Sequence, residues 1–140
     1  MKIPLDQCRR NLAVVWFLGG GILFALLIVQ TLGNHYGEED REAWGWLMPN
    51  IMPTLSLIIG VLVAEAVGSD SKEKLADAFL YRMSLALSII YLLLVLLSIV
   101  AQPFTSSSPM DALKRSNLWL GPLQGLVSAS LGAFFIKAKT

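Results

Sequence analysis

Charged and apolar positions alternate along the chain in long blocks, and the length of these blocks predicts the class of protein. The residues 11–32, 44–64, 83–110 and 116–136 form four stretches without a charged side chain. A helix that crosses a ~30 Å hydrocarbon core needs roughly 20 residues. The pattern predicts an all-α integral membrane protein, a single transmembrane domain over residues 1–140 with helices at about 10–32, 47–68, 71–102 and 117–137.

Composition supports this class and narrows the partners. The chain is 55% hydrophobic and 15% charged, with a mean hydropathy of +0.63, outside the usual range of soluble domains. The net charge of +1 gives no electrostatic reason to expect a nucleic-acid partner. The expected surroundings are therefore a lipid bilayer, and no nucleic acid is expected as a partner.

The basic residues predict how the chain is oriented. Of the 11 lysines and arginines, most fall on one side of the predicted membrane: Lys2, Arg9, Arg10, Lys72, Lys74, Arg82, Lys137 and Lys139. Cytoplasmic loops collect lysine and arginine. Both termini are therefore expected in the cytoplasm, with a multi-pass chain in the bacterial inner membrane.

Two halves of the chain look like copies of one helical hairpin. A shift of 72 residues aligns Arg10 with Arg82 and Gly60 with Gly132, and a shift of 73 aligns Trp46 with Trp119. We predict parallel repeats at about 5–68 and 77–140. Because both copies would enter and leave on the same side, any two-fold axis between them would run along the membrane normal.

Polar signatures predict two helix starts outside the apolar stretches. Asp70-x-x-Glu73 has the spacing of a capping box, so the third helix is expected to start near residue 71 and to extend into the cytoplasm. This extension, with Lys72, Lys74 and Arg82, is a predicted contact surface for a cytoplasmic protein partner. On the other side, Ser108-Pro109-x-Asp111 predicts a short interfacial helix to residue 115.

Small residues recur at helical spacing in three of the four stretches. We predict that they form helix-packing or homo-oligomer contacts, because small side chains let helix backbones approach in lipid. The third stretch, with YLLLVLLSIV, is bulky and is expected to face lipid. The predicted packing residues are Gly19, Gly20, Gly21, Ser56, Gly60, Gly121, Gly125, Ser128 and Gly132.

The predicted spans offer almost nothing for catalysis. No nucleophile–base set, metal-ligand cluster or phosphate loop is recognisable, so we expect a protein that is not an enzyme, with no catalytic residue, metal or cofactor. Glu65 is the ionisable residue closest to the interior of a span, one turn from its cytoplasmic end. It is expected to snorkel, to pair with another subunit, or to act in gating.

Prolines stand where two of the helices are expected to begin. Pro49 and Pro122 each follow a tryptophan, Trp46 and Trp119, by three residues, and a first-turn proline loses no helical hydrogen bond. The pattern predicts a helix-entry motif. Pro53 does not fit this motif, and a broken helix at a binding site is the alternative interpretation.

The segments WGWLMPxxMPTLSLIIG and LWLGPLQGLVSxSLGxFF resemble small uncharacterised bacterial four-helix membrane proteins, some of them from phage-defence gene clusters. The resemblance implies a membrane component that works with another gene product. We therefore expect a non-enzymatic oligomeric subunit that acts as an anchor, sensor or membrane-perturbing effector, with a small ion channel or transporter as the alternative. An assembly factor without flux is a third hypothesis.

Overall fold

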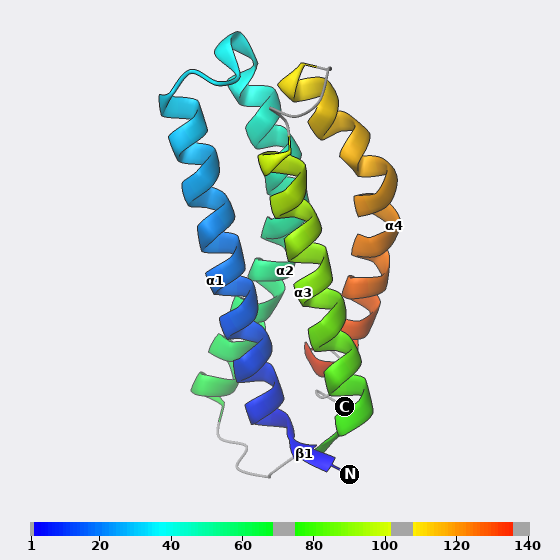
Figure 1. Ribbon diagram of the computed structural model, residues 1–140. Helices are drawn as coiled ribbons and strands as arrows, with labels where there is room; N and C mark the ends of the chain where they lie inside the picture. Colours follow the sequence, from blue (N-terminus) through cyan, green and yellow to red (C-terminus); the bar gives the residue numbers. More distant parts are fainter. Residues whose placement is uncertain (1, 69–74, 102–107, 136–140) are drawn as a thin grey trace.

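The computed structural model describes residues 2–68, 75–101 and 108–135, which are almost entirely helical. Long helices fill these ranges: α1 (Leu5–Leu32), α2 (Asp40–Val67), α3 (Ala78–Val100) and α4 (Pro109–Phe135). A single 3-10 turn, η1 (Gly37–Glu39), precedes α2. Two short strands, β1 (Lys2–Pro4) and β2 (Leu75–Asp77), pair antiparallel at the end of the bundle where α1 starts (Figure 1).

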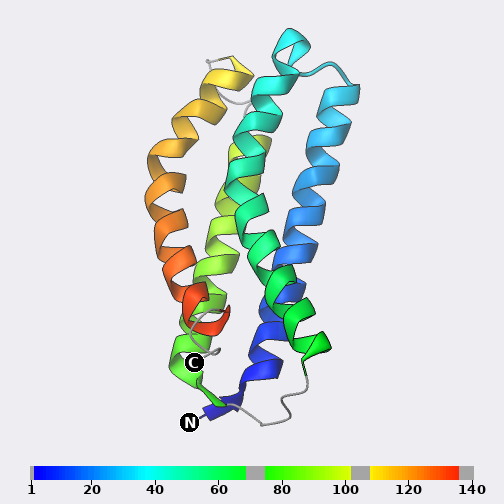
Figure 2. The ribbon, with the colours of Figure 1, turned by 180° about the vertical axis from the view of Figure 1, so that it is seen from behind.

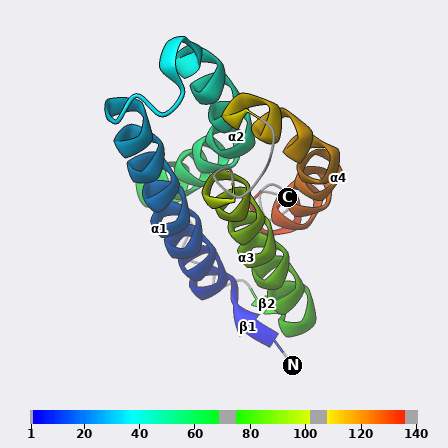
Figure 3. The same cartoon turned by 45° about the horizontal axis from the view of Figure 1, so that its top comes forward.

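The helices run alternately up and down, and α4 ends at the same end of the bundle at which α1 begins (Figure 1). Helix α1 packs beside both α2 and α3, and α4 packs beside the same two helices on the other side (Figures 2 and 3). A two-fold axis along the helices would instead place α1 and α3 across the bundle from each other. The two hairpins therefore lie side by side without the axis that the repeat predicted, and the duplication stays a prediction.

Within the described ranges, three helical segments are long and apolar enough to cross a membrane: Leu5–Leu32, Gly37–Val67 and Ala78–Val100. Their outer surfaces carry bulky apolar side chains, such as Leu18 and Val29 on α1 and Leu93 on α3, each more than half exposed. Such a surface is unusual in water and suits lipid. The fold is thus a helical bundle with candidate transmembrane helices, and α4 as a fourth span stays a prediction.

Helix α3 starts later than the capping box predicted. Residues 75–77 are a strand, and Asp77 caps the helix by accepting a hydrogen bond from the backbone N–H of Phe79 (3.2 Å). The expected helix from residue 71 with a long cytoplasmic extension is therefore wrong over residues 75–77. The Asp70–Glu73 signature itself lies outside the described residues.

Helix α2 starts earlier than predicted, and α4 is one helix where two were predicted. Helix α2 begins at Asp40 and not near residue 47, with Asp40 and Glu42 in its first turn. The start at Ser108 is confirmed, because Ser108 Oγ accepts from the N–H of Asp111 (3.3 Å). The helix does not stop at residue 115, however. It continues as α4 to Phe135, and within it the Ser116 hydroxyl is buried and donates to the Leu113 carbonyl.

The core lies between the four helices, and α3 belongs to it as much as the others do. Tyr91, Val95 and Ile99 of α3 are almost fully buried against Trp16, Leu23 and other apolar residues. The expectation that α3 faces lipid and takes no part in the core is therefore wrong for this side of the helix. Serines interrupt its bulky side chains on one side, and this side turns inward.

Candidate functional site

Buried polar side chains form a line through the apolar core, which we call the polar seam. It joins all four helices and is defined by Arg9 and Trp16 on α1, Trp46 and Asn50 on α2, Ser84, Ser88 and Tyr91 on α3, and Ser116 on α4. Burying a polar group without a partner is costly, so the pairing of these groups fixes how the helices fit together. We take the seam as the candidate functional site.

At the end where the chain begins, Arg9 of α1 forms an ion pair with Glu65 of α2. The Arg9 side chain is 2% exposed and that of Glu65 is 40% exposed, so the carboxylate lies at the edge of the bundle and the guanidinium inside it. A buried guanidinium needs a counter-charge. The pair supplies one and ties α1 to α2 at this end.

The next polar contact joins the two parallel helices α1 and α3. The indole N–H of Trp16 donates to Ser88 Oγ (3.0 Å), and the Trp16 ring lies against the Tyr91 ring with centroids 5.9 Å apart. One turn before Ser88, the Ser84 hydroxyl is also buried, and within the described part of the chain it has no hydrogen-bond partner. Trp16 and Ser88 are 72 residues apart, the same separation that aligned the two predicted repeats.

The centre of the seam is a cluster around Asn50. The Tyr91 hydroxyl lies 2.9 Å from the Asn50 backbone carbonyl and 3.0 Å from its side-chain oxygen, and it donates to both. The Asn50 amide nitrogen donates to the Trp46 carbonyl, and the Trp46 indole N–H donates to Ser116 Oγ. These bonds connect α3 to α2 and α2 to α4 across the bundle.

Beside this cluster, α4 compensates for a proline in α2. Proline has no N–H, so Pro53 leaves the carbonyl of Pro49, four residues earlier, without its helical donor. The side-chain amide of Gln124 donates to this Pro49 carbonyl (2.9 Å). A polar side chain of a neighbouring helix thus satisfies a backbone group that has lost its helical donor.

The prolines do not form a helix-entry motif. Pro49 and Pro53 are 9 and 13 residues after the first residue of α2, and Pro122 is inside α4 (49 − 40 and 53 − 40). The motif prediction was wrong because the helices begin well before the apolar stretches do. The two tryptophans also differ, since Trp46 is buried in the seam and Trp119 is 46% exposed.

The predicted packing glycines divide into two groups. On α1, a Cβ added at Gly19 would lie 2.7 Å from Leu92 of α3, and one at Gly20 would lie 3.3 Å from Leu55 of α2. These two glycines allow close packing within the chain. By contrast, among the described residues an added Cβ would meet nothing within 4 Å at Gly21, Gly60, Gly121 or Gly125.

The remaining predicted residues lie at the surface or outside the described ranges. Ser56 and Ser128 are exposed, and Gly132 is half-buried. Arg82 is exposed near the start of α3. Lys72 and Lys74 lie outside the described residues, so their predicted partner contact has no structural counterpart here.

Sequence reasoning missed most of the seam. It treated Arg9 as a membrane-flanking charge and assigned no role to Asn50, Tyr91 or Gln124. The signal that could have found the centre is Asn50 between two prolines, because a polar residue within an apolar stretch needs a partner at the same depth.

The polar groups of the seam are paired mainly with one another across the helices. Among the residues that the structure describes, no three His, Cys, Asp or Glu side chains are close enough together to hold a metal ion. Cys8 is buried, and His35 packs edge-on against Tyr36 with ring centroids 4.9 Å apart. What the seam can do is fix or change the relative position of helices.

Comparison with protein families, with curated proteins and with solved structures finds no match to this chain.

Proposed function

We propose that the protein is a non-enzymatic, oligomeric integral-membrane subunit of the bacterial inner membrane, with both termini in the cytoplasm and α4 as a fourth span. It acts as an anchor, sensor or membrane-perturbing effector of a multi-protein system and has a cytoplasmic protein partner. The resemblance of its proline-containing segments to proteins of phage-defence clusters suggests antiphage defence as the setting.

One observation carries the oligomeric part of this proposal. Small residues on α2 and α4 point away from the chain's own core, and Gly60 and Gly125 have open space where a side chain would be. Ser56 is exposed one turn before Gly60, so the small face of α2 is continuous. Lipid gives helices no hydrophobic reason to associate, but smooth faces of this kind let backbones approach closely.

Cysteine cross-linking in membranes tests this proposal. In a Cys8→Ala background, Gly60→Cys and Gly125→Cys should give cross-linked dimers with a short bifunctional reagent. Leu18→Cys on α1 is the matched control. Leu18 is 64% exposed, but it does not lie on the small-residue faces of α2 or α4. Cross-linking that is equally efficient at Leu18, or absent at both glycine positions, would contradict the proposed interface.

A small ion channel or transporter is the second candidate, favoured by the Asn50 cluster. The Asn50, Tyr91 and Gln124 side chains lie near the middle of α2, where two prolines interrupt the helical hydrogen bonds. Broken helices with polar side chains at mid-depth are typical of transport sites. Ion flux into liposomes that contain the purified protein, lost on Asn50→Leu, would favour this candidate. Flux that is absent, or unchanged by the substitution, would count against it.

A further inference from the structure

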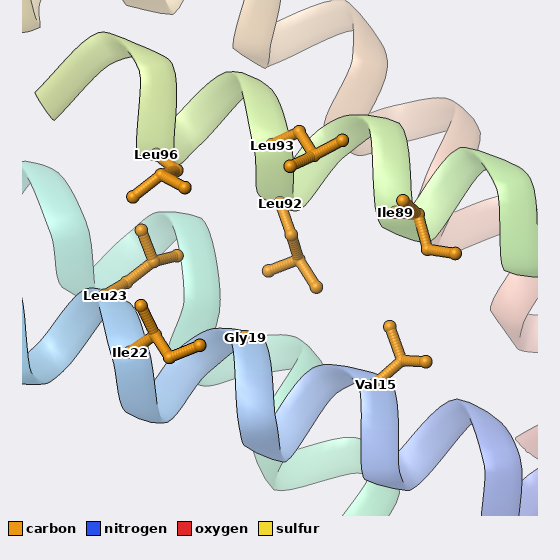
Figure 4. A pocket seen from close by; sticks show the side chains of 8 residues that line it. All are labelled: Val15, Gly19, Ile22, Leu23, Ile89, Leu92, Leu93 and Leu96. Atoms are coloured by element: carbon orange, nitrogen blue, oxygen red, sulfur yellow. The ribbon is translucent and has the colours of Figure 1, made fainter. Parts of the chain in front are cut away.

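A groove on the outer side of α1 and α3 suggests a binding site outside the polar seam. It has a volume of about 180 Å³, and its lining is apolar, with Val15, Gly19 and Ile22 from α1 and Ile89, Leu92 and Leu93 from α3 (Figure 4). At this groove Gly19 lets the Leu92 side chain of α3 approach α1 closely, because a Cβ at Gly19 would lie 2.7 Å from Leu92. We call it the α1/α3 groove.

The rim of the groove faces the surroundings of the bundle. Ile22 is 56% exposed, Ile89 41% and Leu93 56%, and both helices are candidate membrane spans. These bulky rim residues differ from the small outward residues of α2 and α4, so the rim does not offer a smooth surface for a second helix. A groove lined by apolar side chains fits a flexible hydrocarbon chain better.

A positive charge lies at one end of the same face. Arg82 is 7 residues before Ile89 and 11 before Leu93, which places the three on one side of α3 at 100° per residue. Arg82 is exposed and makes no ion pair within the part of the chain that the structure describes. Next to it, Tyr81 accepts a hydrogen bond from the Asn11 amide (2.9 Å), so α1 and α3 meet at this level.

The distances along α3 from Arg82 to the groove match the hydrocarbon thickness of one lipid leaflet. At 1.5 Å per residue, Ile89 and Leu93 lie about 10 and 16 Å along α3 from Arg82. Half of a ~30 Å hydrocarbon core is about 15 Å. A phosphate at Arg82 could therefore have its acyl chain in the groove.

From these observations we infer that the α1/α3 groove binds an anionic phospholipid, with one acyl chain against Ile22 and Leu93 and the headgroup phosphate at Arg82. The apolar part of the site holds any phospholipid chain, and Arg82 adds the preference for negative charge. One basic side chain near a membrane surface accounts for a preference of about fivefold.

The headgroup is tested by titrating the purified protein in mild detergent with phosphatidylglycerol and with phosphatidylcholine of the same acyl chains, and counting bound lipid by native mass spectrometry. The wild type should prefer phosphatidylglycerol about fivefold, and Arg82→Gln should remove this preference. Arg10→Gln is the matched control, because Arg10 is exposed near the same end but 9 residues from Gly19, on the opposite side of α1. No preference in the wild type, or equal loss in both variants, would overturn the inference.

The acyl-chain part has its own pair of variants. Ile22→Trp should fill the groove and weaken binding of both lipids severalfold, while Ile28→Trp, at a similarly exposed position turned away from the groove, should not. Thermal midpoints equal to the wild type would show that both variants fold. Binding that Ile22→Trp leaves unchanged would place the lipid elsewhere and overturn the inference.

Discussion

The inner and outer sides of α2 differ in the contacts that they make with the rest of the bundle. The inner side is held by specific bonds and close contacts: Trp46 and Asn50 take part in the polar seam, and Ile51 and Leu55 pack over Gly20 of α1. On the outer side, a Cβ added at Gly60 would meet no atom of the described residues within 4 Å. The comparison shows that small residues at helical spacing do not by themselves indicate the core. We expect the inner side to determine stability and the outer side to determine assembly.

The largest effect should come from filling the contact between α1 and the inner side of α2. Gly20→Leu should lower the free energy of unfolding by about 3 kcal/mol, because an added side chain would overlap Leu55. Unfolding in mixed micelles, titrated with sodium dodecyl sulfate, measures it. Gly21→Leu is the control, since nothing lies within 4 Å there. Similar losses in both variants would mean that helix flexibility, and not packing, explains the glycines.

A somewhat smaller effect is expected at the centre of the polar seam. Asn50→Leu removes the bond to the Trp46 carbonyl and one of the two acceptors of the Tyr91 hydroxyl, which should cost about 2 kcal/mol in the same unfolding measurement. Asn117→Leu changes an exposed asparagine on α4 and should cost little. If the two substitutions lowered the free energy of unfolding equally, the Asn50 cluster would not contribute to stability.

The ion pair at the end of α2 should contribute less, because its carboxylate is partly in contact with solvent. Glu65→Gln should cost about 1 kcal/mol, reduced from the cost of a fully buried pair by the 40% exposure of Glu65. Glu42→Gln breaks the pair with Lys114 (3.4 Å), in which both side chains are more than half exposed, and should cost almost nothing. A larger loss at Glu42 than at Glu65 would reverse this ranking.

The smallest effect on unfolding is expected on the outer side of α2. Gly60→Leu should leave the free energy of unfolding of the isolated chain unchanged within about 0.5 kcal/mol, since no neighbour is displaced. In membranes, however, it should abolish the cross-linked dimer reported by Gly125→Cys. If Gly60→Leu destabilised the isolated chain by as much as Gly20→Leu, the two sides of α2 would not differ as described.

Local signals in the sequence predicted a helix start correctly where a residue acts only on its own helix. Ser108 caps α4 as its spacing predicted, because capping needs only the next three residues. The start of α3 was wrong because Asp77, after a short strand, provides the cap in place of the earlier signature. The start of α2 near residue 47 and the break near residue 115 of α4 were predicted wrongly because charged residues were taken to end a helix, although charged side chains are readily tolerated in helices outside the apolar core.

The amino-acid sequence determined the class of this protein by itself, since apolar stretches of membrane-spanning length and their composition are properties of the chain alone. Only the tertiary structure decided which polar residues meet. Asn50 with Tyr91, Arg9 with Glu65, and Gln124 with the Pro49 carbonyl are separated by 41, 56 and 75 residues (91 − 50, 65 − 9, 124 − 49). The physical reason is that each pairing depends on the rotation and depth of two different helices, which no local pattern specifies.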